Sequence, residues 1–146
     1  EWAIRNNGIM THAQPPESMG LDQDFPDSVE VQLLGTDGST PRTTANLCTP
    51  GISVILNGER TPEHCYVSET QGPAPGEWAN IEVEVRGDRV VRHFVNGQLA
   101  MEYFEPLLDE QRPWSPTRAL GSGYIALQAE SAGTEFRNIE RMVLVE

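Results

Sequence analysis

The chain contains no lysine: all ten of its basic residues are arginines, against 22 aspartates and glutamates, and the net charge over 146 residues is -12. A surface of this sign repels the phosphate backbone of nucleic acids and the anionic headgroups of lipids. Long apolar runs are also missing, and none approaches the roughly 20 residues that a helix needs to cross a bilayer. We therefore expect no nucleic-acid partner and no membrane span.

Cysteine is scarce too, and Cys48 and Cys65 are the only two. Two cysteines cannot build a zinc site alone, and their spacing matches no zinc knuckle. Two alternatives remain: a pair of buried free thiols, or a disulfide that would stabilise the fold by about 3 kcal/mol through loop closure. We favour the disulfide, which requires an oxidising compartment and predicts a secreted or periplasmic protein in its mature form.

Several catalytic signatures are absent. The sequence has no Gly-Xaa-Ser-Xaa-Gly turn, no phosphate-binding loop, no His-Glu-Xaa-Xaa-His motif and no dinucleotide fingerprint. It also lacks the closely spaced acidic trio of jelly-roll retaining glucanases, and Glu30 has no evident partner for a two-carboxylate glycosidase. The many carboxylates permit a divalent metal ion as a cofactor, but no aspartate-rich loop marks a calcium site, so its ligands are left unassigned.

What the sequence does contain is alternation of apolar and polar residues. In residues 81–86, isoleucine or valine alternates with glutamate or arginine, which is typical of a half-buried strand. A second such run covers 89–95, and Asn96-Gly97 predicts a tight type I′ turn into a third run at 98–104. We therefore expect an antiparallel meander over 78–104. Further strands are predicted over 28–34, 124–130 and 134–145, with shorter ones at 2–4, 9–13, 52–56 and 65–68.

Eleven prolines and 13 glycines gather between these runs, as expected of loops. No window shows a helical stripe of useful length. Many short strands separated by turn signals predict an all-β fold, a two-sheet antiparallel sandwich or jelly roll. Because 146 residues suit one domain, residues 1–146 are expected to form a single jelly-roll domain.

Four polar residues lie at alternating positions on two of the predicted strands. Glu30 and Gln32 are two residues apart, so their side chains leave one face of the strand roughly 7 Å apart. Gln128 and Glu130 repeat this spacing on another strand. If both strands belong to one sheet, the four side chains line a surface whose donors and acceptors suit sugar hydroxyls. The alternative is an ordinary solvated strand face.

The three histidines are His12, His64 and His93. A neutral imidazole next to a carboxylate can act as general base or metal ligand near pH 7, so His12 and His93 are candidates for that role. By alternation, His93 is equally a candidate for a hydrogen-bonded core residue. His64 adjoins Cys65 and is expected in a loop.

The motifs of this chain occur in an order that resembles a known family. They are the segments 6–14, 30–35, 46–51, 64–65, 76–78, 82–87, 93–97, 123–130 and 135–139. Together they resemble domain-of-unknown-function family 1080, now called the 3-keto-disaccharide hydrolase domain. The most specific part is Gly-Tyr-Ile-Ala-Leu-Gln at 123–128 with Phe-Arg-Asn-Ile at 136–139. The resemblance covers nearly the whole chain and implies a concanavalin-A-like jelly roll of the lectin and glucanase type.

Two features depart from the family pattern. Asn6-Asn7-Gly8 stands where the family usually has Asn-Ser-Gly, and family members normally carry further N-terminal strands before this motif. Either those strands have been removed, so that the domain is N-terminally truncated, or the sandwich is completed another way, for example by a second copy of the chain. An uncovered strand edge would favour such self-association.

The resemblance also implies a chemistry that needs no carboxylate pair. A keto group at sugar C3 acidifies the C2 proton, so one base can remove it, the C1 leaving group departs by elimination, and water adds afterwards. A donor cluster or a metal must stabilise the enolate. We therefore expect a glycoside hydrolase-like enzyme for 3-keto or otherwise modified di- and oligosaccharides. The expected catalytic residues are Glu30, His12 and His93, and the expected substrate-binding residues are Asn6, Gln32, Gln128 and Glu130. The alternative is a non-catalytic, lectin-like carbohydrate-binding module.

Overall fold

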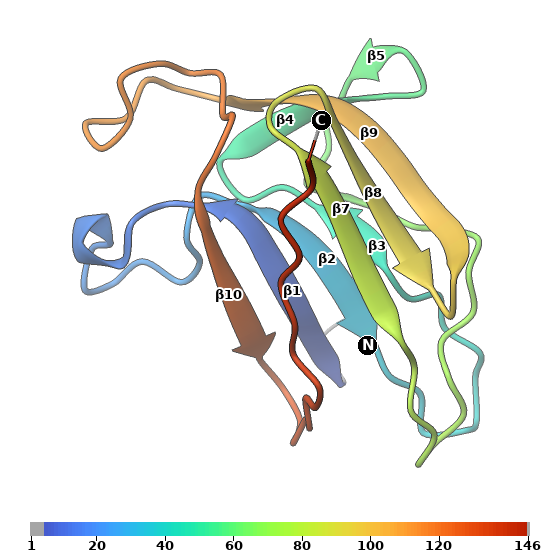
Figure 1. The fold of residues 1–146 in the computed structure, drawn as a ribbon. Helices are drawn as coiled ribbons and strands as arrows, with labels where there is room; N and C mark the ends of the chain where they lie inside the picture. The colour runs from blue at the N-terminus through green and yellow to red at the C-terminus, as the bar shows by residue number, and fades with distance from the viewer. Residues whose placement is uncertain (1–4, 146) are drawn as a thin grey trace.

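The computed structural model describes residues 5–145, which form two antiparallel five-stranded sheets that face each other (Figure 1). The order in the first sheet is β10 (Tyr124–Ala129), β1 (Asn6–Ala13), β2 (Val29–Leu34), β3 (Asn46–Cys48) and β6 (Cys65–Tyr66). The order in the second sheet is β5 (Glu59–Arg60), β4 (Ile52–Leu56), β9 (Gln98–Leu108), β8 (Val90–Val95) and β7 (Ile81–Arg86). A short 3-10 turn, η1 (Pro16–Ser18), lies between β1 and β2. The predicted all-β, two-sheet antiparallel fold is confirmed.

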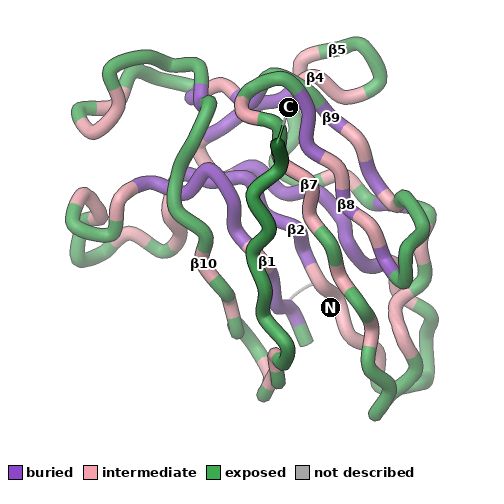
Figure 2. Tube along the Cα trace, viewed as in Figure 1, coloured by how far each residue is buried: buried purple, intermediate pink, exposed green. Residues whose placement is uncertain are grey.

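The hydrophobic core lies between the two sheets. Val29 and Leu47 of the first sheet meet Ile52 and Val91 of the second, and all four are buried (Figure 2). Burying such a side chain stabilises the fold by about 1.5–3 kcal/mol. On β2, Val29, Val31 and Leu33 face the core. Because side chains alternate along a strand, Glu30 and Gln32 point to the outer face of the first sheet.

The meander formed by β7, β8 and β9 is confirmed, with each strand paired to the next. Asn96 and Gly97 have positive φ values of 51° and 78°, as a type I′ turn requires. The Asn96 side chain also accepts a hydrogen bond from the backbone N–H of Asn80. β9 continues to Leu108, through the segment in which the sequence showed no clear strand pattern.

The structure contains two strands that the sequence did not predict, and two predicted strands are either absent or outside the described residues. β3 and β5 are too short to show alternation and were not predicted. Residues 134–145 were predicted as a strand but follow an irregular path without strand pairing in the described part of the chain (Figure 1). An alternating segment becomes a strand only where a neighbouring strand takes its backbone hydrogen bonds. The predicted strand at 2–4 lies outside the described residues.

The predicted disulfide is confirmed. Cys48 of β3 and Cys65 of β6 are directly paired in the sheet register and joined through their sulfurs. The bridge therefore ties the short edge strand β6 to the rest of the first sheet. Across residues 5–145, no helix is long and apolar enough to cross a membrane.

Candidate functional site

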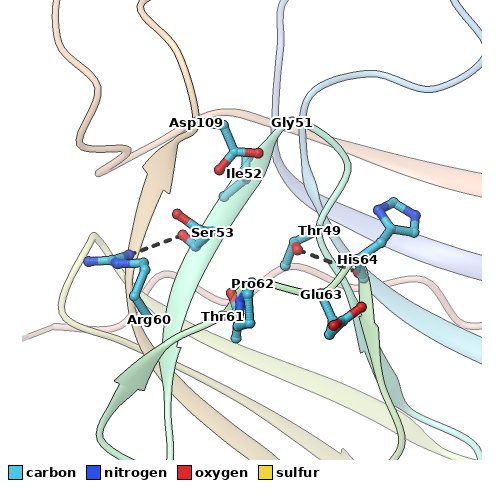
Figure 3. A pocket seen from close by; sticks show the side chains of 10 residues that line it. All are labelled: Thr49, Gly51, Ile52, Ser53, Arg60, Thr61, Pro62, Glu63, His64 and Asp109. Carbon is cyan, nitrogen blue, oxygen red and sulfur yellow. Dashed lines mark hydrogen bonds between the residues drawn. The ribbon is translucent and has the colours of Figure 1, made fainter.

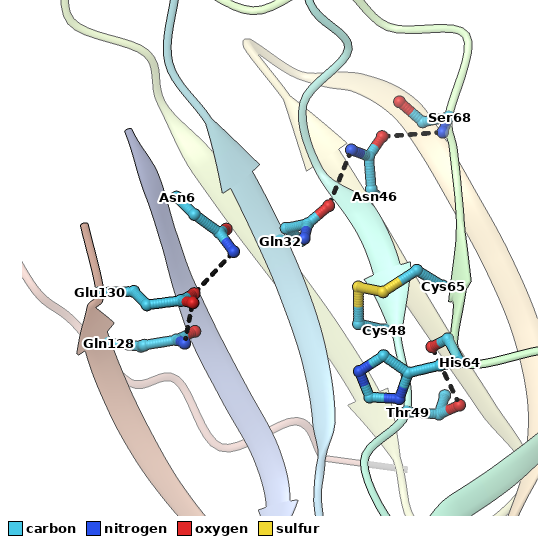
Figure 4. Close-up of a disulfide and its surroundings, with 10 residues drawn as sticks. All are labelled: Asn6, Gln32, Asn46, Cys48, Thr49, His64, Cys65, Ser68, Gln128 and Glu130. Atoms are coloured by element: carbon cyan, nitrogen blue, oxygen red, sulfur yellow. Dashed lines mark hydrogen bonds between the residues drawn. A yellow bond between two sulfur atoms is a disulfide. The ribbon is translucent and has the colours of Figure 1, made fainter. Parts of the chain in front are cut away.

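The sheet register brings the two predicted polar pairs onto one surface. β1 lies between β2 and β10, and Gly8 of β1 pairs with Gln32 on one side and with Gln128 on the other. Gln32 in turn pairs with Asn46 of β3. Because directly paired residues share a face, these positions lie on the outer face of the first sheet, where Figure 4 shows Gln32, Asn46 and Gln128. We call this surface the polar face, which comprises Asn6, Gly8, Glu30, Gln32, Asn46, Gln128 and Glu130.

Gly8 leaves room at the centre of the polar face. A Cβ atom at this position would lie 2.8 Å from Gln128 Oε1 and 2.9 Å from Glu30 Oε1. The two oxygens therefore occupy the space that any other residue would fill. Glycine at position 8 is what allows a carboxylate and an amide from opposite neighbouring strands to approach one another over β1.

Glu130 orients two amide side chains. Its Oε2 accepts hydrogen bonds from Asn6 Nδ2 at 2.6 Å and from Gln128 Nε2 at 3.2 Å (Figure 4). Because an ionised carboxylate can only accept, both amides must turn their amino groups toward it. The carbonyl oxygens of Asn6 and Gln128 consequently point away from Glu130.

Three buried oxygens of the polar face have no hydrogen-bond partner: Asn6 Oδ1, Glu30 Oε1 and Gln128 Oε1. They are the only such side-chain atoms among the residues that the structure describes. Asn6 is 3% exposed and Glu30 is 5% exposed. A buried polar group without a partner costs about 1–3 kcal/mol, so three in one place make the polar face a candidate ligand site.

The pKa of Glu30 is raised to about 7. Burial is the larger cause, because it disfavours the charged carboxylate, and the negative charge of Glu130 adds to it. Glu30 is therefore near half ionisation at neutral pH, where a general base or acid is most effective.

On the other side of Gly8, the amide of Gln32 is held by β3. Asn46 Nδ2 donates to Gln32 Oε1 at 3.2 Å, while Asn46 Oδ1 accepts from the backbone N–H of Ser68 at 2.9 Å. The amino group of Gln32 is thereby left as a donor on the polar face. Asn46 was not predicted as a site residue, because it belongs to a three-residue strand that shows no periodicity.

The structure does not bring the two candidate histidines, His12 and His93, to the polar face. His12 lies at a bulge in β1 with a positive φ of 52°, and its Nε2 bonds to the carbonyl of Gly87 at 3.0 Å. His93 is buried between the sheets, where Nδ1 bonds to the carbonyl of Ala45 and Nε2 to the hydroxyl of Tyr103. Burial lowers the pKa of both, that of His93 to about 4. The core alternative for His93 is confirmed.

A separate pocket of about 390 Å³ lies between β4 and the loop before β6 (Figure 3). It is lined by polar side chains that include Ser53, Arg60, His64 and Asp109. His64 is exposed and follows the chain into Cys65, as expected of a loop residue. None of the unpartnered buried atoms in the described residues belongs to this pocket, so the polar face is the stronger candidate site.

For a metal ion, the polar face offers oxygen atoms. No group of three histidine, cysteine, aspartate or glutamate side chains in residues 5–145 is arranged to hold one. Asn6, Glu30 and Gln128 would be the residues to contact a hard cation, because carboxylate and amide oxygens are the ligands that Ca²⁺ and Mg²⁺ take.

Comparison with known proteins identifies the family of this chain. Searches of curated proteins and of solved structures each returned no match. The family model described as the 3-keto-alpha-glucoside-1,2-lyase-like domain matches residues 1–141, which is nearly the whole chain. The resemblance stated from the motifs is thereby confirmed, and the chain belongs to the 3-keto-alpha-glucoside-1,2-lyase-like domain family.

Proposed function

We propose that the polar face binds a glycoside oxidised at C3 of the sugar and that Glu30 cleaves it by acting as the base. One observation carries this proposal. Glu30 is a buried carboxylate with an unpartnered oxygen and a pKa of about 7, set beside a glycine in a family named for keto-glucoside chemistry. Glu30 therefore combines a carboxylate that can act as a base at neutral pH with an oxygen that has no partner within the protein.

The proposed reaction begins with the keto group at C3, which acidifies the proton on C2. The Glu30 carboxylate takes this proton, and the electron pair of the C2–H bond passes to the C3 oxygen as an enolate. The enolate then returns its electrons to form the C1–C2 double bond, and the C1–O bond breaks. The departing alkoxide takes up a proton, which the protonated Glu30 supplies. Addition of water to the unsaturated sugar completes a net hydrolysis.

The other residues of the polar face divide into donors and acceptors. The free oxygens of Asn6 and Gln128 would accept hydrogen bonds from sugar hydroxyls, with Glu130 holding both amides in place. The amino group of Gln32 would donate to the C3 oxygen as it gains negative charge, which is the role of an oxyanion donor. This chemistry requires one base and one donor, and it does not require His12 or His93.

Replacement of Glu30 by glutamine tests the proposal. Glu30→Gln keeps the shape of the side chain but removes the base, so kcat/KM on a 3-keto disaccharide should fall about 1,000-fold. The thermal transition should not fall, because a neutral amide is easier to bury than a carboxylate. Glu82→Gln, an exposed carboxylate on β7, is the matched control and should retain full activity. A rate close to that of the unaltered protein in Glu30→Gln would exclude Glu30 as the base.

A non-catalytic carbohydrate-binding module is the second candidate, and Tyr124 supports it. By alternation along β10, Tyr124 shares the face of Gln128, about 13 Å along the strand, and its ring is exposed. An exposed aromatic ring beside polar residues suits stacking on a sugar. Saturable binding of a glycoside without any product in the activity assay would select this function over the enzyme.

Two further expectations accompany the proposal. The disulfide supports a secreted or periplasmic location, which fractionation of the native host would test. Self-association is proposed through β10, an edge strand that contains no charged residue and that, among residues 5–145, pairs with β1 alone. In contrast, β7, an edge strand of the second sheet, carries Glu82, Glu84 and Arg86. Light scattering should therefore show a dimer. Replacing Leu127 with a charged residue should abolish it.

A further inference from the structure

The orientation of Gln32 follows from a chain of hydrogen bonds that begins at a backbone group. The backbone N–H of Ser68 donates to Asn46 Oδ1, and Asn46 Nδ2 donates to Gln32 Oε1 (Figure 4). A backbone N–H can only donate, so the oxygen of Asn46 must face Ser68 and its amino group must face Gln32. The oxygen of Gln32 is then turned to Asn46, and Gln32 Nε2 is the atom left to meet a ligand. We call these three residues the amide relay.

The amide relay is held in a buried, hydrogen-bonded setting. Asn46 is 1% exposed. Ser68 Oγ donates to the carbonyl of Thr44 at 2.6 Å and accepts from the backbone N–H of Thr70 at 3.1 Å. Turning the Asn46 amide around would leave its amino group against a backbone N–H, at a cost of about 1–3 kcal/mol. The donor at Gln32 is therefore set before a ligand arrives.

We infer that Asn46 is a positioning residue that makes the polar face selective for a ligand carbonyl oxygen at Gln32, an inference that rests on the proposed function. A ketone oxygen can only accept hydrogen bonds, so it fits the amino group of Gln32 and is disfavoured next to the free oxygens of Glu30 and Gln128. A hydroxyl can donate or accept and fits on either side. The amide relay consequently fixes where the oxidised carbon of the sugar lies, with its neighbouring C–H directed toward Glu30.

Asn46→Asp inverts this arrangement with almost no change in shape. The new carboxylate still accepts from the Ser68 N–H, but it has no donor for Gln32. The Gln32 amide is then expected to turn its amino group to the carboxylate and present Oε1 to the ligand. Gln32→Glu is a second variant, which keeps the bond from Asn46 and places an oxygen where Nε2 was. Asn80→Asp is the matched control, because Asn80 is exposed, lies before β7 and gains the same charge.

The measurement is calorimetric binding of methyl 3-keto-α-glucoside and of the unoxidised methyl α-glucoside. All variants are compared in the Glu30→Gln background, so that the keto glycoside is not turned over. Asn46→Asp and Gln32→Glu should each weaken binding of the keto glycoside about 100-fold, because an oxygen then faces the ketone without a donor. Both should change the affinity for the unoxidised glycoside by no more than about threefold, and Asn80→Asp should change neither affinity.

The outcomes separate the inference from the proposed function. An unchanged ratio of the two affinities in Asn46→Asp and Gln32→Glu, or an equal loss for both glycosides, would overturn the role of Asn46. If the protein with Glu30 intact binds the keto glycoside but does not cleave it, the proposed catalysis is wrong while the ratio still decides the role of the amide relay. If neither glycoside binds in any background, both proposals are wrong.

Discussion

Two regions of this molecule bury polar side chains, and they differ in whether the buried polar atoms have hydrogen-bond partners. Between the sheets, both ring nitrogens of His93 have partners, the carbonyl of Ala45 at 3.0 Å and the hydroxyl of Tyr103 at 2.8 Å. The ring also packs edge-on against Tyr103, with the ring centroids 5.2 Å apart. His12 is likewise bonded at both nitrogens, to Thr11 and to Gly87. Every polar atom of these two rings is satisfied by the protein itself.

On the polar face, the buried Asn6 and Glu30 and the half-buried Gln128 keep three oxygens without partners. Burial of Glu30 raises the pKa of its carboxyl group, and repulsion by the nearby charge of Glu130 raises it further. Nothing in the fold requires this arrangement, since an apolar residue at position 30 would avoid both costs. The paired groups stabilise the fold, whereas the unpaired ones do not, which is why the proposed function assigns them to a ligand.

Apart from removal of the base itself, the largest effect on activity is expected at the centre of the polar face. Gly8→Ala places a methyl group within 3 Å of Glu30 Oε1 and Gln128 Oε1, both at the ends of flexible side chains that can move aside. The fold should survive while the two oxygens are displaced, and kcat/KM on a 3-keto glycoside should fall about 100-fold. Gly121→Ala is the control, because nothing lies within 4 Å of a Cβ there. Full activity in Gly8→Ala would show that the two oxygens do not contact the substrate.

A substitution at His93, between the sheets, should have the opposite effect: it should lower stability and leave activity unchanged. His93→Phe keeps a ring of similar size but leaves the Tyr103 hydroxyl and the Ala45 carbonyl buried without partners, which should lower the free energy of unfolding by about 3 kcal/mol. Urea denaturation measures this loss, and the activity of the folded protein should be unchanged. Adding Tyr103→Phe removes one of the two stranded groups and should restore part of the stability. A loss of activity without a loss of stability would place His93 in the mechanism instead.

Much of the fold could be predicted from local sequence because strands of five or more residues show their alternation. The turn at Asn96-Gly97 and the strands at 28–34 and 81–86 are examples. β3 has only three residues and could not be found in this way, although it carries both Asn46 and Cys48. Residues 134–145 have strand-like alternation but no strand to pair with in the described residues, so the pattern alone was misleading.

The site was only partly predictable, for a geometric reason. Residues two apart on a strand share one face, which predicted that Glu30 lies beside Gln32 and that Gln128 lies beside Glu130. Only the sheet order shows that a single strand, β1, separates the two pairs. Gly8 was part of a motif, yet its role depends on atoms contributed by both neighbouring strands. The place of His12 could not be predicted from alternation, because β1 has a bulge between Met10 and Ala13, whereas alternation had already offered a core position for His93.

The unfavourable environment of Glu30 should be measurable as a dependence of stability on pH. The folded pKa of about 7 lies above the ordinary value of 4.5, so the folded protein retains a proton that the unfolded chain has lost between these values. The contribution of Glu30 to the free energy of unfolding is fully present below pH 4.5 and is lost as the pH rises through 7. Glu30→Gln has no such loss, so its stability relative to the unaltered protein should increase over this interval and level off near pH 8 at roughly 3 kcal/mol at most. A constant difference across the interval would contradict the raised pKa.

The smallest expected effect isolates the contribution of Glu130. Glu130→Gln removes the negative charge near Glu30, so the pKa of Glu30 should fall while remaining above its ordinary value, because burial is the larger cause and is unchanged. The rising limb of kcat/KM against pH should move to lower pH, which increases the rate in mildly acidic buffer. At alkaline pH the rate should instead fall slightly, since a neutral amide no longer forces Asn6 and Gln128 to turn their amino groups toward position 130. A mere loss of fold would lower the rate equally at every pH, so the crossing of the two profiles distinguishes repulsion at the polar face from general damage.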